Sequence, residues 1–246
     1  MRNITVTRYV TPLREGGSLP AIVEGDDNGL YVLKFRGAGQ GARALVAELV
    51  AGELARAAGL PVPEIVFADL DPDLARTEPD PEIQELIRAS AGLNLALDYL
   101  PGSVMFDPVA DAPDGLLASC IVWFDALVTN IDRTAKNTNL LMWHRKLWMI
   151  DHGAAMYFHH GTTDFVSRAK DPFAAVKDHV LLRFADAIEE ADTVLCPKLT
   201  RDCVEKVAAL VPAEWEADPG RYTDYFMARL ASPRAFVEEA IRARSA

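Results

Sequence analysis

One segment, residues 128–155, constrains the fold of this chain more than any other part. It reads VTNIDRTAKNTNLLMWHRKLWMIDHGAA. Two short apolar runs in it, at 140–143 and 147–150, flank a polar His-Arg-Lys sequence at 144–146. Strand-like runs on both sides of a short polar turn are typical of a β-hairpin. We therefore expect a hairpin here, with a polar loop before it and an Asp-His-Gly sequence directly after it.

The polar residues on either side of this hairpin have the chemistry of a phosphoryl-transfer site. Asp132 and Asn137 precede the first strand, and Asp151 follows the second. The hairpin is expected to bring Asn137 and Asp151 close together, with Asp132 on the loop that leads in. Two such oxygen donors can hold magnesium, which takes carboxylate, carbonyl and water ligands. A third carboxylate nearby can orient or deprotonate a nucleophile, and together these are the parts that phosphoryl transfer requires.

Taken singly, each of these residues is also typical of a turn or a strand end, and their spacing is the distinguishing feature. Asp-x-x-x-x-Asn, a hairpin and Asp-x-Gly resemble the H-R-D-x-x-x-x-N and D-F-G segments of the kinase superfamily. Asp-Arg-Thr at 132–134 with Asp-His-Gly at 151–153 is most similar to the HipA-type kinases and their relatives, the phosphatidylinositol kinases. Those relatives often have a histidine after the Asp-Arg pair, where this chain has Thr134. The contribution of that histidine is therefore absent here or comes from elsewhere.

The N-terminal part of the chain predicts an antiparallel sheet. Strand-like sequences occupy three ranges, 4–10, 21–24 and 30–35, and a hairpin turn is expected at 26–29. The resemblance implies that this sheet is the small lobe of a kinase, with a loop over the nucleotide phosphates formed by Gly16, Gly17 and Ser18. HipA-type kinases are autophosphorylated on a serine in that loop, which makes Ser18 the corresponding candidate. As a pattern, two glycines and a serine more often form an ordinary turn.

Lys34 stands in an otherwise apolar strand, where a lysine either extends to the surface or points into a cleft with an anionic partner. By resemblance to the V-A-I-K strand of kinases, it contacts the ATP phosphates. The helix expected at 42–58 offers two glutamates as its partner. Glu53 has Arg56 one turn away and fits a surface pair. Glu48 lies on a stripe of small residues suited to close packing against a sheet. The sequence AELVAGELARAAGLPVP at 47–63 also resembles the helix of HipA-type kinases in which the first glutamate is the partner of the lysine. We therefore expect Glu48 to hold Lys34 in place.

A dinucleotide-binding site, and with it an oxidoreductase, is the competing interpretation of this region. Gly-Ala-Gly-Gln-Gly-Ala at 37–42 follows a strand and opens a helix, and the strand expected at 65–69 ends on an acid. Lys34 and Arg36 conflict with this interpretation, because the strand before such a motif is normally apolar. The acid also lies farther along than the usual ~20 residues. Moreover, the acids and the amide around the hairpin would have no role.

The middle of the chain predicts the connection between two lobes. The alternating sequence at 93–100 is expected to form a strand that ends at a Pro-Gly pair. By its order along the chain this strand corresponds to the hinge of a kinase. The resemblance therefore implies that backbone groups of Asp98, Tyr99 and Leu100 contact adenine. A strongly apolar helix expected at 116–129 would form the core of the second lobe and bring Asp132 to the site. Residues 171–246 are expected to be mainly helical.

Composition limits the partners and the location of the protein. The net charge of −11 argues against nucleic-acid binding, because phosphate backbones need a basic surface. The three cysteines have no metal-ligand spacing and suggest no disulfide framework, so a reducing compartment fits. The N-terminus has no signal-peptide pattern, and no apolar run has the length of a membrane span. We therefore expect a cytoplasmic protein.

Together these features predict an α+β, bilobal kinase-like fold in one domain, with a small lobe at 1–100 and a larger, mainly helical lobe at 101–246. The resemblance implies that the protein transfers the γ-phosphate of ATP, with magnesium, to a hydroxyl, and Ser or Thr of a protein is the expected acceptor. It assigns the acceptor hydroxyl to Asp132, the phosphates to Lys34 with Glu48, and magnesium to Asn137 and Asp151. A small-molecule or lipid kinase shares all of these motifs. A nucleotide-binding or partner-binding protein without catalysis also stays open, because of Thr134.

Overall fold

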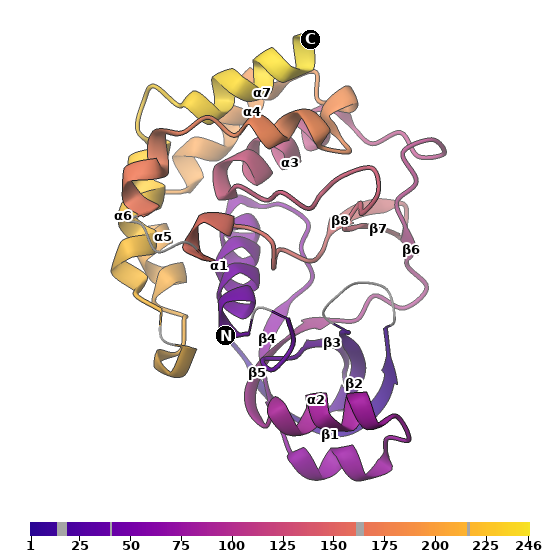
Figure 1. Ribbon diagram of the computed structural model, residues 1–246. Helices are drawn as coiled ribbons and strands as arrows, with labels where there is room; N and C mark the ends of the chain where they lie inside the picture. The colour runs from indigo at the N-terminus through magenta and orange to yellow at the C-terminus, as the bar shows by residue number, and fades with distance from the viewer. Residues whose placement is uncertain (14–18, 40, 161–164, 216) are drawn as a thin grey trace.

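The computed structural model describes residues 1–13, 19–39, 41–160, 165–215 and 217–246. Its strands form two sheets, a closed barrel and a small three-stranded sheet (Figure 1). The barrel strands are β1 (Asn3–Pro12), β2 (Ala21–Gly25), β3 (Leu30–Lys34), β4 (Ile65–Leu70) and β5 (Gly92–Asp98). The small sheet contains β6 (Val104–Met105), β7 (Leu140–Trp143) and β8 (Lys146–Met149). In Figure 1 the barrel lies at one end of the molecule and most of the helices at the other.

The barrel has the strand order β1-β2-β3-β5-β4 and closes through β1 and β4. Successive side chains of a strand point to opposite faces, so alternate apolar residues fill the interior. Ile4, Val23 and Leu33 are examples, each at most 3% exposed. The predicted antiparallel pairing of the first three strands is confirmed. The closing pair is parallel, with Asn3 opposite Phe67, and the sequence did not predict this closure.

Helix α1 (Ala42–Ala58) has the bounds that the sequence predicts. It ends at Gly59, whose φ of 85° is left-handed and whose backbone N–H caps the carbonyls of the last turn. Glycine is favoured at such an end because a side chain would be strained there. Leu45 through Gly52 are all buried, since the helix packs against β4 and β5 on one side and against α5 on another. This packing places Glu48 in the interior of the molecule.

The remaining helices are α2 (Pro81–Ala89), α3 (Gly115–Val128), α4 (Ile188–Leu195), α5 (Arg201–Ala208), α6 (Pro219–Leu230) and α7 (Ala235–Ser245). Short 3-10 helices occur at Pro72–Thr77, Tyr157–His160, Phe165–Lys170, Ala174–Asp178, Leu182–Phe184, Cys196–Lys198 and Ala213–Trp215. Helix α3 is buried from Ala118 to Val128 and forms the centre of the helical part, as predicted. Across the described residues, no helix combines the length and the apolar character that crossing a bilayer requires.

The predicted hairpin is confirmed as β7 and β8, joined by His144 and Arg145. Both turn residues have positive φ, 48° and 63°, as a tight turn between twisted strands requires. The Met149 backbone N–H donates to the Pro61 carbonyl at 2.7 Å and ties the hairpin to the segment after α1. The hairpin is therefore fixed relative to the helix that carries Glu48.

The strand pairing excludes the dinucleotide-binding interpretation. Strands β3 and β4 flank α1 in sequence, yet β3 pairs with β2 and β5, whereas β4 pairs with β5 and β1. A dinucleotide-binding unit needs parallel strands around its helix in an open sheet. That interpretation was wrong because the glycine pattern at 37–42 is local and does not determine which strands pair with each other.

Candidate active site

Lys34, at the end of β3, has its ammonium between two carboxylates. Its Nζ atom is 2.8 Å from Asp151 Oδ1 and 3.8 Å from Glu48 Oε2. The lysine side chain is only 11% exposed. Burial disfavours its charge, but the carboxylates of Asp151 and Glu48 outweigh burial and raise the pKa of Lys34 above its ordinary value. The site therefore holds a charged ammonium beside the Asp-His-Gly segment.

Glu48 joins Lys34 to that same segment. Its Oε2 atom accepts a hydrogen bond from the His152 backbone N–H at 2.9 Å, and its Oε1 atom lies 3.6 Å from His152 Nδ1. Burial alone would raise the pKa of Glu48, but Lys34 and His152 lower it to about 2. Glu53 instead pairs with Arg56 at 3.2 Å. The contact expected between Glu48 and Lys34 is thus present, and Glu53 forms the surface pair expected of it.

Amide groups hold the carboxylate of Asp132. Its Oδ2 atom accepts from Asn137 Nδ2 at 2.7 Å and from Asn139 Nδ2 at 3.2 Å. Its backbone N–H donates to Asn130 Oδ1 at 3.1 Å. The hydrogen bonds of the described residues leave Oδ1 without a donor. The charge of Asp132 is also among those that raise the pKa of Lys34, so the two candidate residues belong to one site.

A buried polar network lies beneath this loop, and the sequence analysis missed it. At its centre Asp125, on α3, accepts from Arg133 Nε at 2.5 Å and lies 2.9 Å from His179 Nε2 through the same oxygen. Its other oxygen accepts from Asn130 Nδ2 at 3.1 Å. Burial would raise the pKa of Asp125, but Arg133 and His179 hold it well below its ordinary value. An acid in an otherwise apolar helix was the available signal, because a buried charge needs a partner.

His179 reaches the loop from a distant segment. Its Nδ1 atom accepts from the Leu181 backbone N–H at 3.0 Å, so the ring proton sits on Nε2 and donates to Asp125. His179 also forms an isolated antiparallel bridge with Thr134. A histidine is therefore supplied beside the position that Thr134 occupies, and no local sequence pattern indicated it.

Arg133 connects the loop of Asp132 to the strand that leads into Asp151. One of its guanidinium nitrogens donates to the Asn139 carbonyl and, at 3.2 Å, to the Ile150 carbonyl. Arg133 is 1% exposed, so these bonds are shielded from water. Asp151 follows Ile150 with a positive φ of 55°, an uncommon backbone state for a residue with a side chain. The hydrogen bonds of Arg133 thus hold the backbone next to both Asp132 and Asp151.

Asp151 and Asn137 are the candidate metal ligands, and in the hydrogen bonds and ion pairs of the described residues each has a different partner. Asp151 contacts Lys34, whereas the amide nitrogen of Asn137 donates to Asp132. Because this hydrogen bond uses the amide nitrogen, the amide oxygen of Asn137 is available as a metal ligand. A carboxylate and an amide oxygen fit magnesium, which completes its shell with phosphate and water oxygens. Within the described ranges, no three His, Cys, Asp or Glu side chains are grouped as a metal site.

The residues expected to contact the nucleotide are only partly described. The loop of Gly16, Gly17 and Ser18 lies outside the described residues. At the expected hinge, the Asp98 backbone N–H donates to the Glu64 carbonyl at 2.8 Å, and the Tyr99 N–H donates to the Leu30 carbonyl at 3.0 Å. Both N–H groups thus already have partners in the protein, so the expected contact with adenine would use other backbone groups of the hinge.

This fold is that of a kinase, as comparison with solved structures shows. The Helicobacter pylori proinflammatory kinase CtkA matches with a TM-score of 0.59 and 12% identity, over 98% of this chain and 99% of that one. The Golgi casein kinase matches with a TM-score of 0.53 and 10% identity, over 100% and 72% of the two chains. Its form with Mn/ADP bound gives a TM-score of 0.52 and 10% identity, over 99% and 73%. At these identities the likeness concerns the fold.

The family is shown by the sequence itself. The model of the HipA-like kinase family matches residues 6–235, nearly the whole chain. The chain therefore belongs to the HipA-like kinases, and the kinase-like fold and kinase activity that the sequence predicts are confirmed. No curated protein matches it in sequence. The division into lobes at residue 100 stays a prediction.

Proposed function

We propose that this kinase transfers the γ-phosphate of ATP, with magnesium, to a serine or threonine hydroxyl of a protein. The observation that carries the proposal is the ammonium of Lys34, held between Asp151 and Glu48 in the same site as Asp132. A fixed cation beside two oxygen ligands for a metal is the arrangement that phosphoryl transfer uses. The Mn/ADP-bound form of the Golgi casein kinase supports the use of a nucleotide and a divalent metal. The name of this neighbour, casein kinase, gives a protein as its acceptor and so supports a protein acceptor here.

Lys34 would bind the phosphates of the nucleotide, and Glu48 would keep its ammonium in place. Because Glu48 also accepts from the His152 backbone, it links the position of Lys34 to that of Asp151. Asn137 and Asp151 would hold magnesium, which neutralises phosphate charge during the transfer. Because Lys34 is already held by two carboxylates, it loses little conformational freedom when the nucleotide binds. Less of the binding free energy is then needed to order its side chain.

Asp132 would orient the acceptor hydroxyl. The two amides that donate to its Oδ2 atom fix the plane of the carboxylate and leave Oδ1 for the hydroxyl proton. As the hydroxyl oxygen bonds to the γ-phosphorus, the bond from that phosphorus to the bridging oxygen breaks and ADP leaves with this oxygen, while the hydroxyl proton would pass to the carboxylate of Asp132. The buried network of Asp125, Arg133 and His179 keeps the loop in this conformation before the substrates arrive.

Titration calorimetry with magnesium-ATP tests the proposal. We expect the substitution Asp151→Asn to weaken magnesium-dependent ATP binding and to abolish turnover, because it removes a charged metal ligand. Asp202→Asn is a matched control, since Asp202 also lies 2.8 Å from a lysine, Lys206, but on the exposed side of α5. If Asp151→Asn binds magnesium-ATP with unchanged affinity, the assignment of Asp151 as a metal ligand is refuted. Wild-type protein that does not bind magnesium-ATP at all would refute the proposed function.

A further inference from the structure

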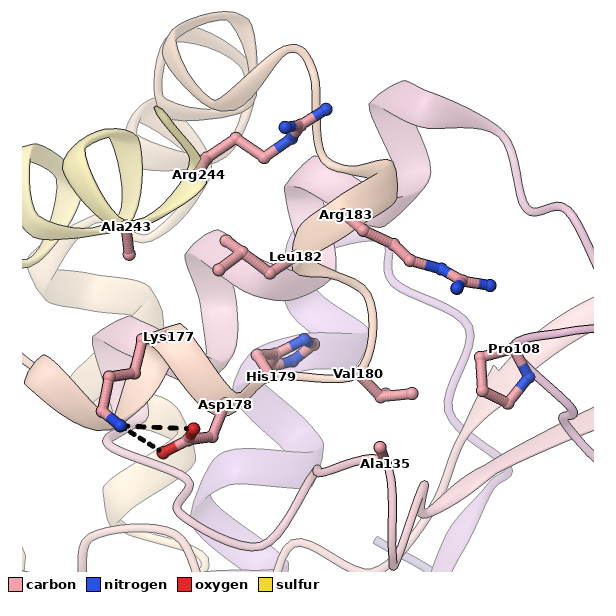
Figure 2. A pocket seen from close by; sticks show the side chains of 10 residues that line it. All are labelled: Pro108, Ala135, Lys177, Asp178, His179, Val180, Leu182, Arg183, Ala243 and Arg244. Carbon is pink, nitrogen blue, oxygen red and sulfur yellow. Dashed lines mark hydrogen bonds and ion pairs between the residues drawn. The ribbon is translucent and has the colours of Figure 1, made fainter. Parts of the chain in front are cut away.

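A pocket of about 350 Å³ lies beside the loop that carries Asp132 (Figure 2). Three cationic side chains line it, Lys177, Arg183 and Arg244, and we call it the basic pocket. It is lined by segments far apart in the chain, because Lys177 and Arg183 precede α4 and Arg244 lies in α7. Nothing in the proposed phosphate transfer uses these three residues.

The charge of the basic pocket is opposite to that of the chain as a whole. Acidic residues outnumber basic ones by 36 to 25 in the sequence. In the pocket one acid, Asp178, faces three cations, and it pairs with Lys177 at 3.3 Å. Among the described residues, neither Arg183 nor Arg244 forms an ion pair. The guanidinium of Arg183 lies over the ring of Phe184, 4.5 Å from its centroid, which orients it without neutralising it.

The pocket is connected directly to the catalytic loop. Ala135, in the loop of Asp132, forms part of its wall. The Val180 backbone N–H donates to the Arg133 carbonyl at 3.1 Å, and His179 bridges to Thr134. His179 and Val180 also line the pocket, and both are buried. A molecule bound in the pocket therefore has a fixed position relative to Asp132.

The placement of the cations selects between a compact and an extended anion. Figure 2 shows the charged ends of Lys177, Arg183 and Arg244 well apart from one another, with Leu182 among them and Val180 below Arg183. A single phosphate group is best bound by donors that converge on one point. Separated cations around an apolar floor suit several carboxylates along one extended chain, whose aliphatic stems cover the floor.

We propose that the basic pocket binds an acidic stretch of the protein acceptor, next to the serine or threonine that is phosphorylated. This inference rests on the proposed function as a protein kinase and adds the class of acceptor to it. Binding of carboxylates at Arg183 and Arg244 places the hydroxyl of a neighbouring residue at Asp132. The specificity comes from charge complementarity, which depends on ionic strength because the pocket is open to solvent.

Fluorescence anisotropy with two labelled peptides tests the pocket directly. One peptide carries a central serine flanked on both sides by glutamates, and the other has glutamine in place of each glutamate. Wild-type protein is expected to bind the glutamate peptide about tenfold more tightly, and less tightly as salt is added. The double substitution Arg183→Ala with Arg244→Ala should weaken that binding by about tenfold, as two lost ion contacts would. The control, Arg76→Ala with Arg201→Ala, removes exposed arginines that pair with Asp73 and Glu205 elsewhere, and should bind as wild type does.

Phosphate transfer to the same peptides supplies the second measurement. In the Arg183 and Arg244 double variant, KM for the glutamate peptide should rise about tenfold while kcat and magnesium-ATP affinity stay unchanged. Both arginines are exposed, so the variant is expected to fold, and an unchanged thermal midpoint checks this. If it does not fold, Arg183→Gln with Arg244→Gln replaces it, and the peptide preference of the wild-type protein is an independent readout.

The possible results separate the two proposals. Equal binding of the two peptides by wild-type protein, or unaltered binding by the folded double variant, overturns the acidic acceptor even if magnesium-ATP binds and is turned over. A third result also overturns the acidic acceptor: inorganic phosphate binds at Arg183 and Arg244 and the glutamate peptide does not. That result would favour a small phosphorylated acceptor. Failure to bind magnesium-ATP refutes the proposed function, and the anisotropy measurement then still decides whether the pocket binds an acidic peptide.

Discussion

Replacement of Asp125 by asparagine perturbs the network beneath the loop that carries Asp132, with little change of shape. The substitution removes the negative charge that faces Arg133 and His179. Asp125 is fully buried and Arg133 is 1% exposed, so the guanidinium keeps its charge in the interior without a counter-charge. Removal of one partner of a buried ion pair costs about 3–5 kcal/mol. That is a large part of the roughly 5–15 kcal/mol by which a domain is stable.

Urea denaturation followed by tryptophan fluorescence measures this loss. We expect Asp125→Asn to lower the midpoint without a change in slope, because the surface exposed on unfolding stays the same. Phosphate transfer should fall as well, since Asn130 and Arg133 hold the loop of Asp132 through Asp125. Asp192→Asn is the control. Asp192 also pairs with an arginine, Arg234, but on the partly exposed surface between α4 and α7, so a smaller loss of stability and full activity are expected. A loss below about 1 kcal/mol in Asp125→Asn would refute the view that the buried pair stabilises the fold.

The same variant has a defined dependence on pH. The folded-state pKa of Asp125 is below that of an aspartate in the unfolded chain, which is about 3.9. The stabilisation that ionised Asp125 contributes is therefore present above that pH and is lost as the pH falls through the folded-state pKa. The difference in stability between wild type and Asp125→Asn should be constant between about pH 5 and 7 and should shrink below about pH 4. A difference that grows as the pH falls would contradict this assignment.

Three further predictions concern the site itself. Asp132→Asn should still bind ATP, while transfer falls by ~10²–10⁴, the usual effect of a positioned acid or base, and wild-type turnover would contradict its role. Lys34→Ala and Glu48→Ala should each reduce transfer and together cost less than the sum of the two, because partners in one network are not additive. Glu53→Ala is the control for that cycle, and strictly additive losses would show that the pair does not act as a unit. Ser18 lies outside the described residues; after incubation with magnesium-ATP, peptide mass spectrometry should find it phosphorylated and calorimetry should find weaker ATP binding, because phosphoserine adds about −1.5 to −2 charges. An unmodified Ser18, or a phosphorylated Ser18 with undiminished ATP binding, would refute this prediction.

Local patterns in the sequence determined most of the secondary structure of this protein. The bounds of α1 follow from its apolar residues and from Gly59, and the β7–β8 hairpin follows from two apolar runs around a polar turn. The choice of Glu48 over Glu53 depended on nearby residues, the small residues on one face and Arg56 on another, together with the resemblance of residues 47–63 to a helix of HipA-type kinases. These features were predictable because propensity, periodicity and end signals act over a few residues.

Contacts between distant segments were decided only by the tertiary structure. The barrel closes because Asn3 meets Phe67 in a parallel pair, and no pattern in either strand specifies that partner. Asp125 was visible only as an acid in an apolar helix, and nothing near it in sequence pointed to His179. The basic pocket likewise requires residues from the loop of Asp132, from the segment before α4 and from α7. The physical reason is common to all three: a charge or a strand edge is satisfied by whichever group packing brings within reach, and packing depends on the whole chain.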